Sequence, residues 1–248
     1  QFSMDEYDSH FRIATTTWIN GTSKNNLYIL DTSLSMVGKL ENVAPEETIY
    51  SARFMGDRCY LVTFRQVDPF FVIDLKDPSS PKVLGQLKIP GFSSYLHPYD
   101  ENHVIGIGKE GMNVKISLFD VSNVGDPKEV GKYLVGGEWS DTPVLTDHKA
   151  FLFDKSKNLL VIPISITKMG IYEDSMWQGA YVFDITLDKE LVLKGGITHL
   201  ENDVDPWSME YWVKRSLYIG NVLYTISDKK VKMNNLETLD EINKVEFS

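Results

Sequence analysis

The sequence predicts an all-β protein in which about five four-stranded antiparallel sheets pack as the blades of a propeller, and three observations support this fold class. First, apolar residues come in runs of four to eight, rich in Val, Ile, Tyr and Phe, and helical periodicity is nearly absent. Second, Gly, Pro, Asn and Asp bound these runs, as turn residues bound strands. Third, the same pattern recurs every ~40–50 residues, a spacing typical of propellers.

The clearest copy of the repeat lies in residues 69–87, where the strand PFFVID is followed by the turn LKDPSSP and the strand KVLGQL. A strand that closes on Asp or Asn before such a turn recurs along the chain. The closing residues are Asp31, Asp74, Asp120, Asp184 and Asn235, at intervals of 43, 46, 64 and 51 residues. We interpret each of them as the start of an Asx turn into the fourth strand of its sheet.

Two further strands precede each copy, joined by a tight turn, as in SARFMGD–CYLVTF and VKRSLYIG–NVLYTIS. The one helix-like segment, LETLDEINKVEF, also fits a turn followed by a strand. The expected blades are 1–43, 48–89, 92–136, 147–196 and 208–248. We expect residues 1–248 to form a single propeller domain, which either closes with five blades or is the C-terminal part of a larger ring.

Composition limits the partners. The net charge is −10, which argues against a nucleic-acid surface, because such a surface needs a basic stripe. No apolar run is long enough to span a membrane. Cys59 is the single cysteine, so it can form no internal disulfide, and its place in the run RCYLVTF predicts a buried thiol.

Several long segments, among them YSARFMGDRCYLVTFRQVDPFFVIDLKDPSSPKVLGQLKIPGF and DHKAFLFDKSKNLLVIPI, resemble a family of secreted archaeal and bacterial β-propeller domains that is distantly related to WD-40 repeats. The hairpin of residues 68–87 also resembles the repeat named for the sequence LVIVD. The resemblance covers essentially the whole chain and matches the C-terminal portion of the family. It implies an extracellular or cell-envelope location and further sequence upstream, and it carries over no catalytic residues.

Strict up-and-down strand order places the second-to-third-strand loops and the connections between blades on one face. The unusual segments 136–148, 166–178 and 199–207 all belong to that face. Long loops on a rigid scaffold often carry function. We therefore predict a partner- or glycan-binding patch there, formed by Asp68, Trp139, Asp141, Asp147, Glu173, Asp174 and Trp177. The alternative is that these are solvated acidic loops that the Trp side chains hold down.

Two smaller sets of residues complete the prediction. Glu201, Asp203 and Asp205 have oxygen spacing that suits Ca²⁺, although the loop lacks the Gly and the distal Glu of an EF-hand. Arg65, His97 and His148 lie in or beside innermost strands, where they can contact a ligand or simply form structural hydrogen bonds. No cofactor other than Ca²⁺ is indicated.

Enzyme motifs such as GxSxG, a P-loop and HExxH are absent from the sequence. The favoured function is therefore a non-catalytic exported scaffold that binds a protein, glycan or other ligand through its acidic, Trp-bearing face. A hydrolase that uses carboxylates or a metal on the same face is the first alternative, because carboxylate pairs follow no spacing rule. A module that only completes a larger ring is the second.

Overall fold

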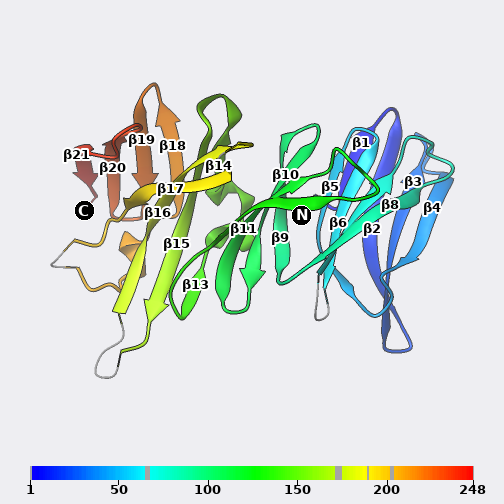
Figure 1. The fold of residues 1–248 in the computed structure, drawn as a ribbon, viewed down its shortest axis with the longest axis horizontal. Helices are drawn as coiled ribbons and strands as arrows, with labels where there is room; N and C mark the ends of the chain where they lie inside the picture. The colour runs from blue at the N-terminus through cyan, green and yellow to red at the C-terminus, as the bar shows by residue number, and fades with distance from the viewer. Residues whose placement is uncertain (1, 65–67, 171–174, 189, 202–203, 248) are drawn as a thin grey trace. The chain divides into compact units, whose positions relative to one another are not determined.

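The computed structural model describes residues 2–64, 68–170, 175–188, 190–201 and 204–247, and these residues form five antiparallel sheets, A to E in chain order (Figure 1). The helices in these ranges are three-residue 3-10 turns, and none is long and apolar enough to cross a membrane. The predicted all-β class of stacked four-stranded sheets is confirmed. The chain divides into two compact units, which we describe separately.

Unit 1 comprises residues 1–110 and 115–131 and contains sheets A and B and most of sheet C. Sheet A consists of β1 (Met4–Tyr7), β2 (His10–Ile19), β3 (Thr22–Leu30) and β4 (Met36–Val43). Sheet B consists of β5 (Thr48–Met55), β6 (Arg58–Phe64), β7 (Asp68–Asp74) and β8 (Lys82–Ile89). Sheet C consists of β9 (Phe92–Asp100), β10 (His103–Glu110), β11 (Asn113–Asp120) and β12 (Lys128–Leu134).

Sheet B has apolar side chains on both faces, because side chains alternate along each strand. On one face, Cys59 and Ile73 pack with Leu27 and Ile29 of sheet A. On the other face, Phe70 stacks on Phe119 of sheet C, with 4.6 Å between ring centroids. Sheet B is therefore covered on both sides. The predicted burial of Cys59 is confirmed, and burial raises the pKa of its thiol.

Four of the recurring residues, Asp31, Asp74, Asp120 and Asn235, form the predicted Asx turns among the contacts that the structure describes. The side-chain Oδ1 of Asp31 accepts hydrogen bonds from the backbone N–H groups of Ser33 (2.8 Å) and Ser35 (2.9 Å). The Oδ1 atoms of Asp74, Asp120 and Asn235 each accept a hydrogen bond from the backbone N–H of the residue two positions further on. These residues are needed by the hairpin, and so they do not indicate a functional site.

A glycine in the fourth strand of a sheet allows the next sheet to pack closely. A Cβ atom added to Gly38 of β4 would lie 2.1 Å from the carbonyl oxygen of Pro78, in the turn between β7 and β8. One added to Gly85 of β8 would lie 2.3 Å from the carbonyl oxygen of Val124, in the turn between β11 and β12. Each turn thus rests against the backbone of the preceding sheet.

Unit 2 comprises residues 111–114 and 132–248 and contains sheets D and E. Sheet D consists of β13 (Trp139–Asp141), β14 (Leu152–Asp154), β15 (Leu159–Lys168), β16 (Ser175–Thr186) and β17 (Glu190–Ile197). Sheet E consists of β18 (Arg215–Ile219), β19 (Val222–Ile226), β20 (Lys230–Asn235) and β21 (Glu241–Glu246). The 3-10 turns are η1 (Pro143–Leu145), η2 (His148–Ala150), η3 (Lys155–Lys157) and η4 (Met209–Tyr211).

Sheet D departs from the expected pattern at its first strand. That position is shared by β13, which pairs with the end of β15, and β14, which pairs with its beginning. Segment 136–148, expected to be a connection, therefore contains a strand and the turn η1. The expected loop 166–178 is largely an extension of the β15–β16 hairpin, which pairs as far as Lys168 and Ser175.

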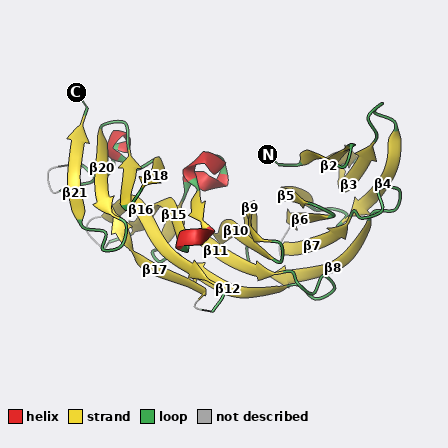
Figure 2. Cartoon of the chain, turned by 90° about the horizontal axis from the view of Figure 1, so that it is seen from above, coloured by secondary structure: helices red, strands yellow, loops and turns green. Residues whose placement is uncertain are grey.

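Sheets D and E pack through a shared apolar core. Val161 and Val182 of sheet D belong to one cluster with Leu223 and Leu236. The glycine contact recurs here, because a Cβ atom on Gly195 of β17 would lie 2.9 Å from Leu239, in the turn between β20 and β21. Figure 2 shows sheet D beside sheet E. The helix-like segment LETLDEINKVEF, residues 236–247, contains a turn followed by β21.

We expect Gly85→Ala to lower the free energy of unfolding by about 1–3 kcal/mol, the usual cost of overpacking, because the new methyl group must displace the backbone of the neighbouring turn. Urea unfolding measures this difference. Gly136→Ala is the matched control, since nothing lies within 4 Å of the Cβ position of Gly136. Equal stability of the two variants would contradict the role of Gly85.

Candidate functional site

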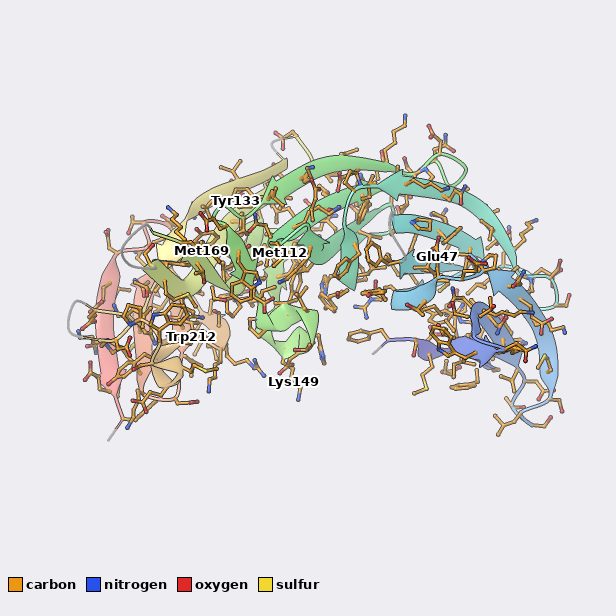
Figure 3. The ribbon with its side chains drawn as sticks, turned by 90° about the horizontal axis from the view of Figure 1, so that it is seen from below. Glu47, Met112, Tyr133, Lys149, Met169 and Trp212 are labelled. Atoms are coloured by element: carbon orange, nitrogen blue, oxygen red, sulfur yellow. The ribbon has the colours of Figure 1, made fainter. Side chains whose placement is uncertain are left out.

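A cavity of about 590 Å³ in unit 2 is the best-formed candidate site, and we call it the Trp212 pocket. Its volume lies in the range of small-molecule sites. Four groups of residues line it: the end of β13 and the segment after it, strands β15 and β16 of sheet D, the segment that leads into sheet E, and the turn between β19 and β20. The lining residues are Asp141, Thr142, Pro143, Leu145, Thr146, Asp147, Ser165, Gln178, Met209, Glu210, Trp212, Val213, Lys214, Arg215 and Asp228. Trp212 is labelled in Figure 3.

Gln178 joins the two sides of the pocket. It is a buried residue of β16, and its side-chain Oε1 accepts a hydrogen bond from the backbone N–H of Val213 (2.7 Å). Its Nε2 donates to the carbonyl oxygen of the same residue (2.9 Å). A buried amide that satisfies both backbone groups of one residue fixes that residue firmly. The segment that carries Trp212 is therefore anchored to sheet D.

The pocket has an apolar wall with a defined geometry. Trp212 is half-buried, and its indole Nε1 donates to the carbonyl oxygen of Pro206 (3.0 Å). Met209 is 65% exposed at the pocket, and Pro143 and Leu145 add apolar surface from η1. The side-chain oxygen of Thr142 caps η1 by accepting from the N–H of Val144. The apolar wall is thus held by local hydrogen bonds on both sides.

Charged groups surround this apolar wall, with four carboxylates against two cationic side chains. Arg215 forms an ion pair with Asp147, and Lys214 forms one with Asp228. The N–H of Lys149 donates to the carboxylate of Asp147, and this bond together with Arg215 holds the pKa of Asp147 below its usual value. Each cationic group is paired with one carboxylate, and the lining contains two more carboxylates than cationic groups.

The structure places two of the predicted site residues, Asp141 and Asp147, at the Trp212 pocket. The predicted tryptophans lie elsewhere. Trp139 pairs with Thr167 in sheet D. Trp177 packs on Tyr181, with 4.9 Å between ring centroids, and its ring would lie 2.8 Å from a Cβ atom on Gly196. Trp177 thus covers glycines of its own sheet, which matches the alternative of a Trp that holds the structure together.

Other predicted residues fall at or beyond the described ranges. Arg65, Glu173, Asp174 and Asp203 lie outside the described residues. Asp68 pairs with Ile89 through the backbone of β7, and the structure does not describe its side chain. Their predicted roles in binding or in a metal site therefore stay predictions.

The two predicted histidines belong to different units. His97 lies on β9 in unit 1, with its Nδ1 2.8 Å from the hydroxyl of Tyr95. Burial, and after it the charge of Arg53, lowers the pKa of His97 to about 4. His148 begins η2 in unit 2. His97 is therefore neutral at physiological pH and joined to its own strand, as a structural histidine would be.

Glu201, a predicted calcium ligand, is bound by lysines. The Nζ atoms of Lys244, Lys230 and Lys232 lie 2.8, 3.2 and 3.3 Å from its carboxylate. The hydrogen bonds from these lysines, led by Lys244, lower the pKa of Glu201 to about 2. Lys230 is a fully buried side chain, so Glu201 and Glu246 (3.1 Å) together supply the counter-charge that its burial requires.

These contacts do not favour calcium at this position. The oxygens of Glu201 already accept from ammonium groups, and Oδ1 of Asp205 accepts from the N–H of Trp207 (3.0 Å). Among the residues that the structure describes, no group of three or more His, Cys, Asp or Glu is placed to hold a metal ion. Because Asp203 is not described, the calcium site stays a prediction.

His199 lies at the start of the connection between sheets D and E, two residues after the end of β17. It is fully buried, with Nδ1 2.9 Å from the hydroxyl of Ser227 and Nε2 2.9 Å from that of Thr225. Burial, followed by the charges of Lys232 and Lys230, lowers its pKa to about 4. His199 and Glu201 thus fix the connection between sheets D and E onto sheet E.

A second cavity in unit 2, about 310 Å³, is lined by residues that include Asn158, Asp184, Asn221 and Glu237. These residues lie in turns or at strand ends, and none of the predicted site residues lines this cavity. The Trp212 pocket is larger and combines apolar with charged groups. We therefore regard it as the candidate site.

The sheet topology and a pocket carried on connecting segments define this chain as a β-propeller protein. It belongs to the β-propeller domain family, whose model matches residues 1–239. It is 38% identical over 250 residues to an uncharacterized protein of Archaeoglobus fulgidus and 41% identical over 250 residues to one of Methanocaldococcus jannaschii. These alignments cover 100% and 99% of the chain but only 35% and 36% of the relatives, so the chain spans about a third of their length.

Solved structures share the fold at low identity. A europium-containing methanol dehydrogenase matches with a TM-score of 0.61 at 10% identity, covering 99% of this chain and 50% of the other. Apo AztD from Citrobacter koseri matches with a TM-score of 0.54 at 12% identity, and the match covers 95% of this chain and 60% of the other. The WD40 domain of Pan2 from Neurospora crassa matches with a TM-score of 0.51 at 8% identity, and the match covers 90% of this chain and 61% of the other. These similarities show a WD40-like propeller fold and no activity.

We expect His199→Gln to flatten the pH dependence of stability between pH 6.5 and 4. The imidazole of His199 takes up a proton near 6.5 in the unfolded chain but only near 4 in the folded one, so the wild type loses stability as the pH falls through this window. Urea unfolding at pH 8, 6, 5 and 4 measures the slope for both proteins. Parallel slopes would show that His199 is protonated while folded.

We expect chelation to leave the melting temperature unchanged, because lysines occupy the carboxylate of Glu201. A bound ion would stabilise the folded state by RT ln(1 + [L]/Kd), so its removal would lower the melting temperature. Thermal melts with EDTA, and with added Ca²⁺, measure the difference. A lower melting temperature in EDTA that Ca²⁺ restores would establish the calcium site instead.

Proposed function

We propose that this protein is a non-catalytic propeller scaffold that binds a partner through the Trp212 pocket. The observation that carries the proposal is the pocket itself: about 590 Å³, with an apolar wall at Trp212 and Met209 and an excess of carboxylates around it. Aromatic anchors beside charged rims are typical of binding surfaces. The proposed ligand is a group with an apolar body and a cationic end, such as a Lys or Arg side chain of a partner protein.

The preformed shape of the pocket supports binding. The hydrogen bonds of Gln178 to Val213 and of Thr142 to the first turn of η1 hold opposite walls of the pocket. A pocket that is already ordered loses less entropy when a ligand enters. The lining of the pocket carries a net negative charge, and so does the whole chain, with a net charge of −10. Both the pocket and the surrounding protein therefore attract a cationic ligand.

The hydrolase alternative fits these residues less well. Carboxylate-based hydrolysis needs one carboxylic acid that keeps its proton near neutral pH. Asp147 is instead held ionised by Lys149 and Arg215. We therefore favour binding over catalysis. An extracellular or envelope location is also part of the proposal, and it rests on the family resemblance.

We expect Trp212→Ala to weaken binding of Lys- and Arg-containing peptides by about tenfold or more, as for an aromatic anchor of an interface. A peptide selected on an array, or a hydrophobic amine found by fragment screening, is titrated against the wild type and the variant, and the two Kd values are compared. Trp207→Ala is the matched control, because Trp207 is 51% exposed but does not line the pocket.

The charge of the ligand has its own test. Binding of the peptide should weaken as the salt concentration rises, and replacement of Lys or Arg by norleucine should abolish it. Equal binding by the Trp212 and Trp207 variants would exclude the pocket as the binding site. Preference for acidic or uncharged peptides would overturn the ligand class but keep the pocket.

A further inference from the structure

Unit 1 contains two arginines whose guanidinium groups lie against aromatic rings, and the two differ in their hydrogen bonds. Arg12 of β2 is buried, and its guanidinium carbon lies 4.7 Å from the ring centroid of Tyr7 and 5.2 Å from that of Phe54. Its Nε and Nη2 donate to the two carboxylate oxygens of Asp5 (2.9 and 2.7 Å), and its Nη1 donates to the carbonyl oxygen of Gly56 (2.6 Å). Each nitrogen of this guanidinium therefore has an acceptor.

Arg53 of β5 has the aromatic contact but not the acceptors. It is partly buried, and its guanidinium carbon lies 4.4 Å from the ring centroid of Phe2. Among the residues that the structure describes, no oxygen atom accepts a hydrogen bond from the Arg53 side chain. A cation–π contact satisfies the face of a guanidinium, but its N–H groups lie at the edge and still need acceptors. Partial burial of such a group without a partner is unfavourable.

The alternation of side chains along β5 directs Arg53 toward sheet C. Its neighbours Ala52 and Phe54 belong to the core that sheet B shares with sheet A. Ser51 lies on the other side of the strand, and its hydroxyl donates to the carbonyl oxygen of Ser93 on β9 (2.7 Å). Arg53 is two residues from Ser51 and so lies on the same side, toward the first strand of sheet C.

Aromatic and neutral polar groups of β9 lie beside Arg53. The ring centroid of Tyr95 lies 5.8 Å from that of Phe2, and the Tyr95 hydroxyl is hydrogen-bonded to Nδ1 of His97. Burial lowers the pKa of Arg53, and the group that opposes this effect is the phenol of Tyr95 rather than a carboxylate. His97 is neutral at physiological pH, because its pKa is about 4. Arg53 therefore supplies the positive charge of this cluster, which we call the Arg53 site.

We propose that Arg53 binds the carboxylate group of a small organic acid. Arg12 shows which group a guanidinium beside aromatic rings binds in this protein, namely a carboxylate that accepts from two of its nitrogens. The planar guanidinium suits a carboxylate because two of its N–H groups point in parallel at the two oxygens. The rings of Phe2 and Tyr95 add apolar surface for the body of the acid. The proposal does not rest on the Trp212 pocket, whose lining is acidic and belongs to unit 2.

Benzoate, a carboxylate on an aromatic ring, is the probe. We expect saturable binding when the wild type is titrated with benzoate and the arginine side-chain N–H signals are followed by NMR. Arg53→Met should weaken this binding about tenfold or more, because the charge-assisted hydrogen bonds are lost. Arg53→Lys should weaken it too, since lysine keeps the charge but not the parallel N–H groups. Arg58→Met, which removes the same charge elsewhere in sheet B, is the control and should bind benzoate as the wild type does, because Arg58 donates to the carbonyl oxygen of Val121 (3.4 Å).

Stability separates a binding role of Arg53 from a structural one. Arg53→Met should melt at the same temperature as the wild type or higher, because it removes a cation that has no partner. Arg12→Met should melt at a lower temperature, because it leaves Asp5 without its cation. A marked loss of stability in Arg53→Met would show a structural role and overturn the proposal.

Three binding results would also overturn it. They are no binding of benzoate by the wild type, equal binding by the wild type and Arg53→Met, and tighter binding of inorganic phosphate than of benzoate. Trp212→Ala should leave benzoate binding unchanged, so the outcome at the Arg53 site is independent of the outcome at the Trp212 pocket.

Discussion

The close approach of sheets A, B and D to the turn of the sheet that follows depends on a residue without a side chain. Gly38, Gly85 and Gly195 lie at equivalent points in the fourth strands of sheets A, B and D. Gly38 and Gly85 meet the backbone of a turn between third and fourth strands, and Gly195 meets the side chain of Leu239 in such a turn. Because packed interiors tolerate few voids or overlaps, this contact sets the distance between neighbouring sheets and so the burial of their faces.

The site in unit 2 depends on that packing. Sheets D and E share a core, and the connection between them is held by His199 and Glu201 on one side and by Gln178 on the other. Trp212 is therefore presented by a segment that is fixed at both ends. The scaffold supplies the rigidity, and the irregular segments supply the chemistry.

The repeat could be predicted from sequence because its signals are local. Alternation such as PFFVID and turn residues such as Asp74 and Pro78 specify hairpins by themselves, and the Asx turns at Asp31 and Asp120 formed as expected. The short strand β13 could not be predicted in the same way. Its three residues pair with the far end of β15, so a long-range contact decides its conformation.

The pocket was only partly predictable for the same reason. Asp141 and Asp147 stood out as acidic residues in a long connection, but Gln178 and Trp212 come together only when sheets D and E pack. The Trp and Met of SMEYW, in a segment that leads into a sheet, were a usable signal for an apolar wall. The lysines that bind the carboxylate of Glu201 could not be inferred in this way, since they are up to 43 residues away in sequence.

The last strand has a consequence for solubility. β21 is the outer edge of sheet E, every residue in it is exposed, and its free backbone groups offer a template for another strand. Its sequence, EINKVE, places Glu241, Lys244 and Glu246 along that edge, where they pair with Lys232, Glu201 and Lys230. A foreign strand that added here would bring its own side chains against these ordered charges. We therefore expect the ion pairs that hold β21 to its sheet also to oppose edge-to-edge association of the protein.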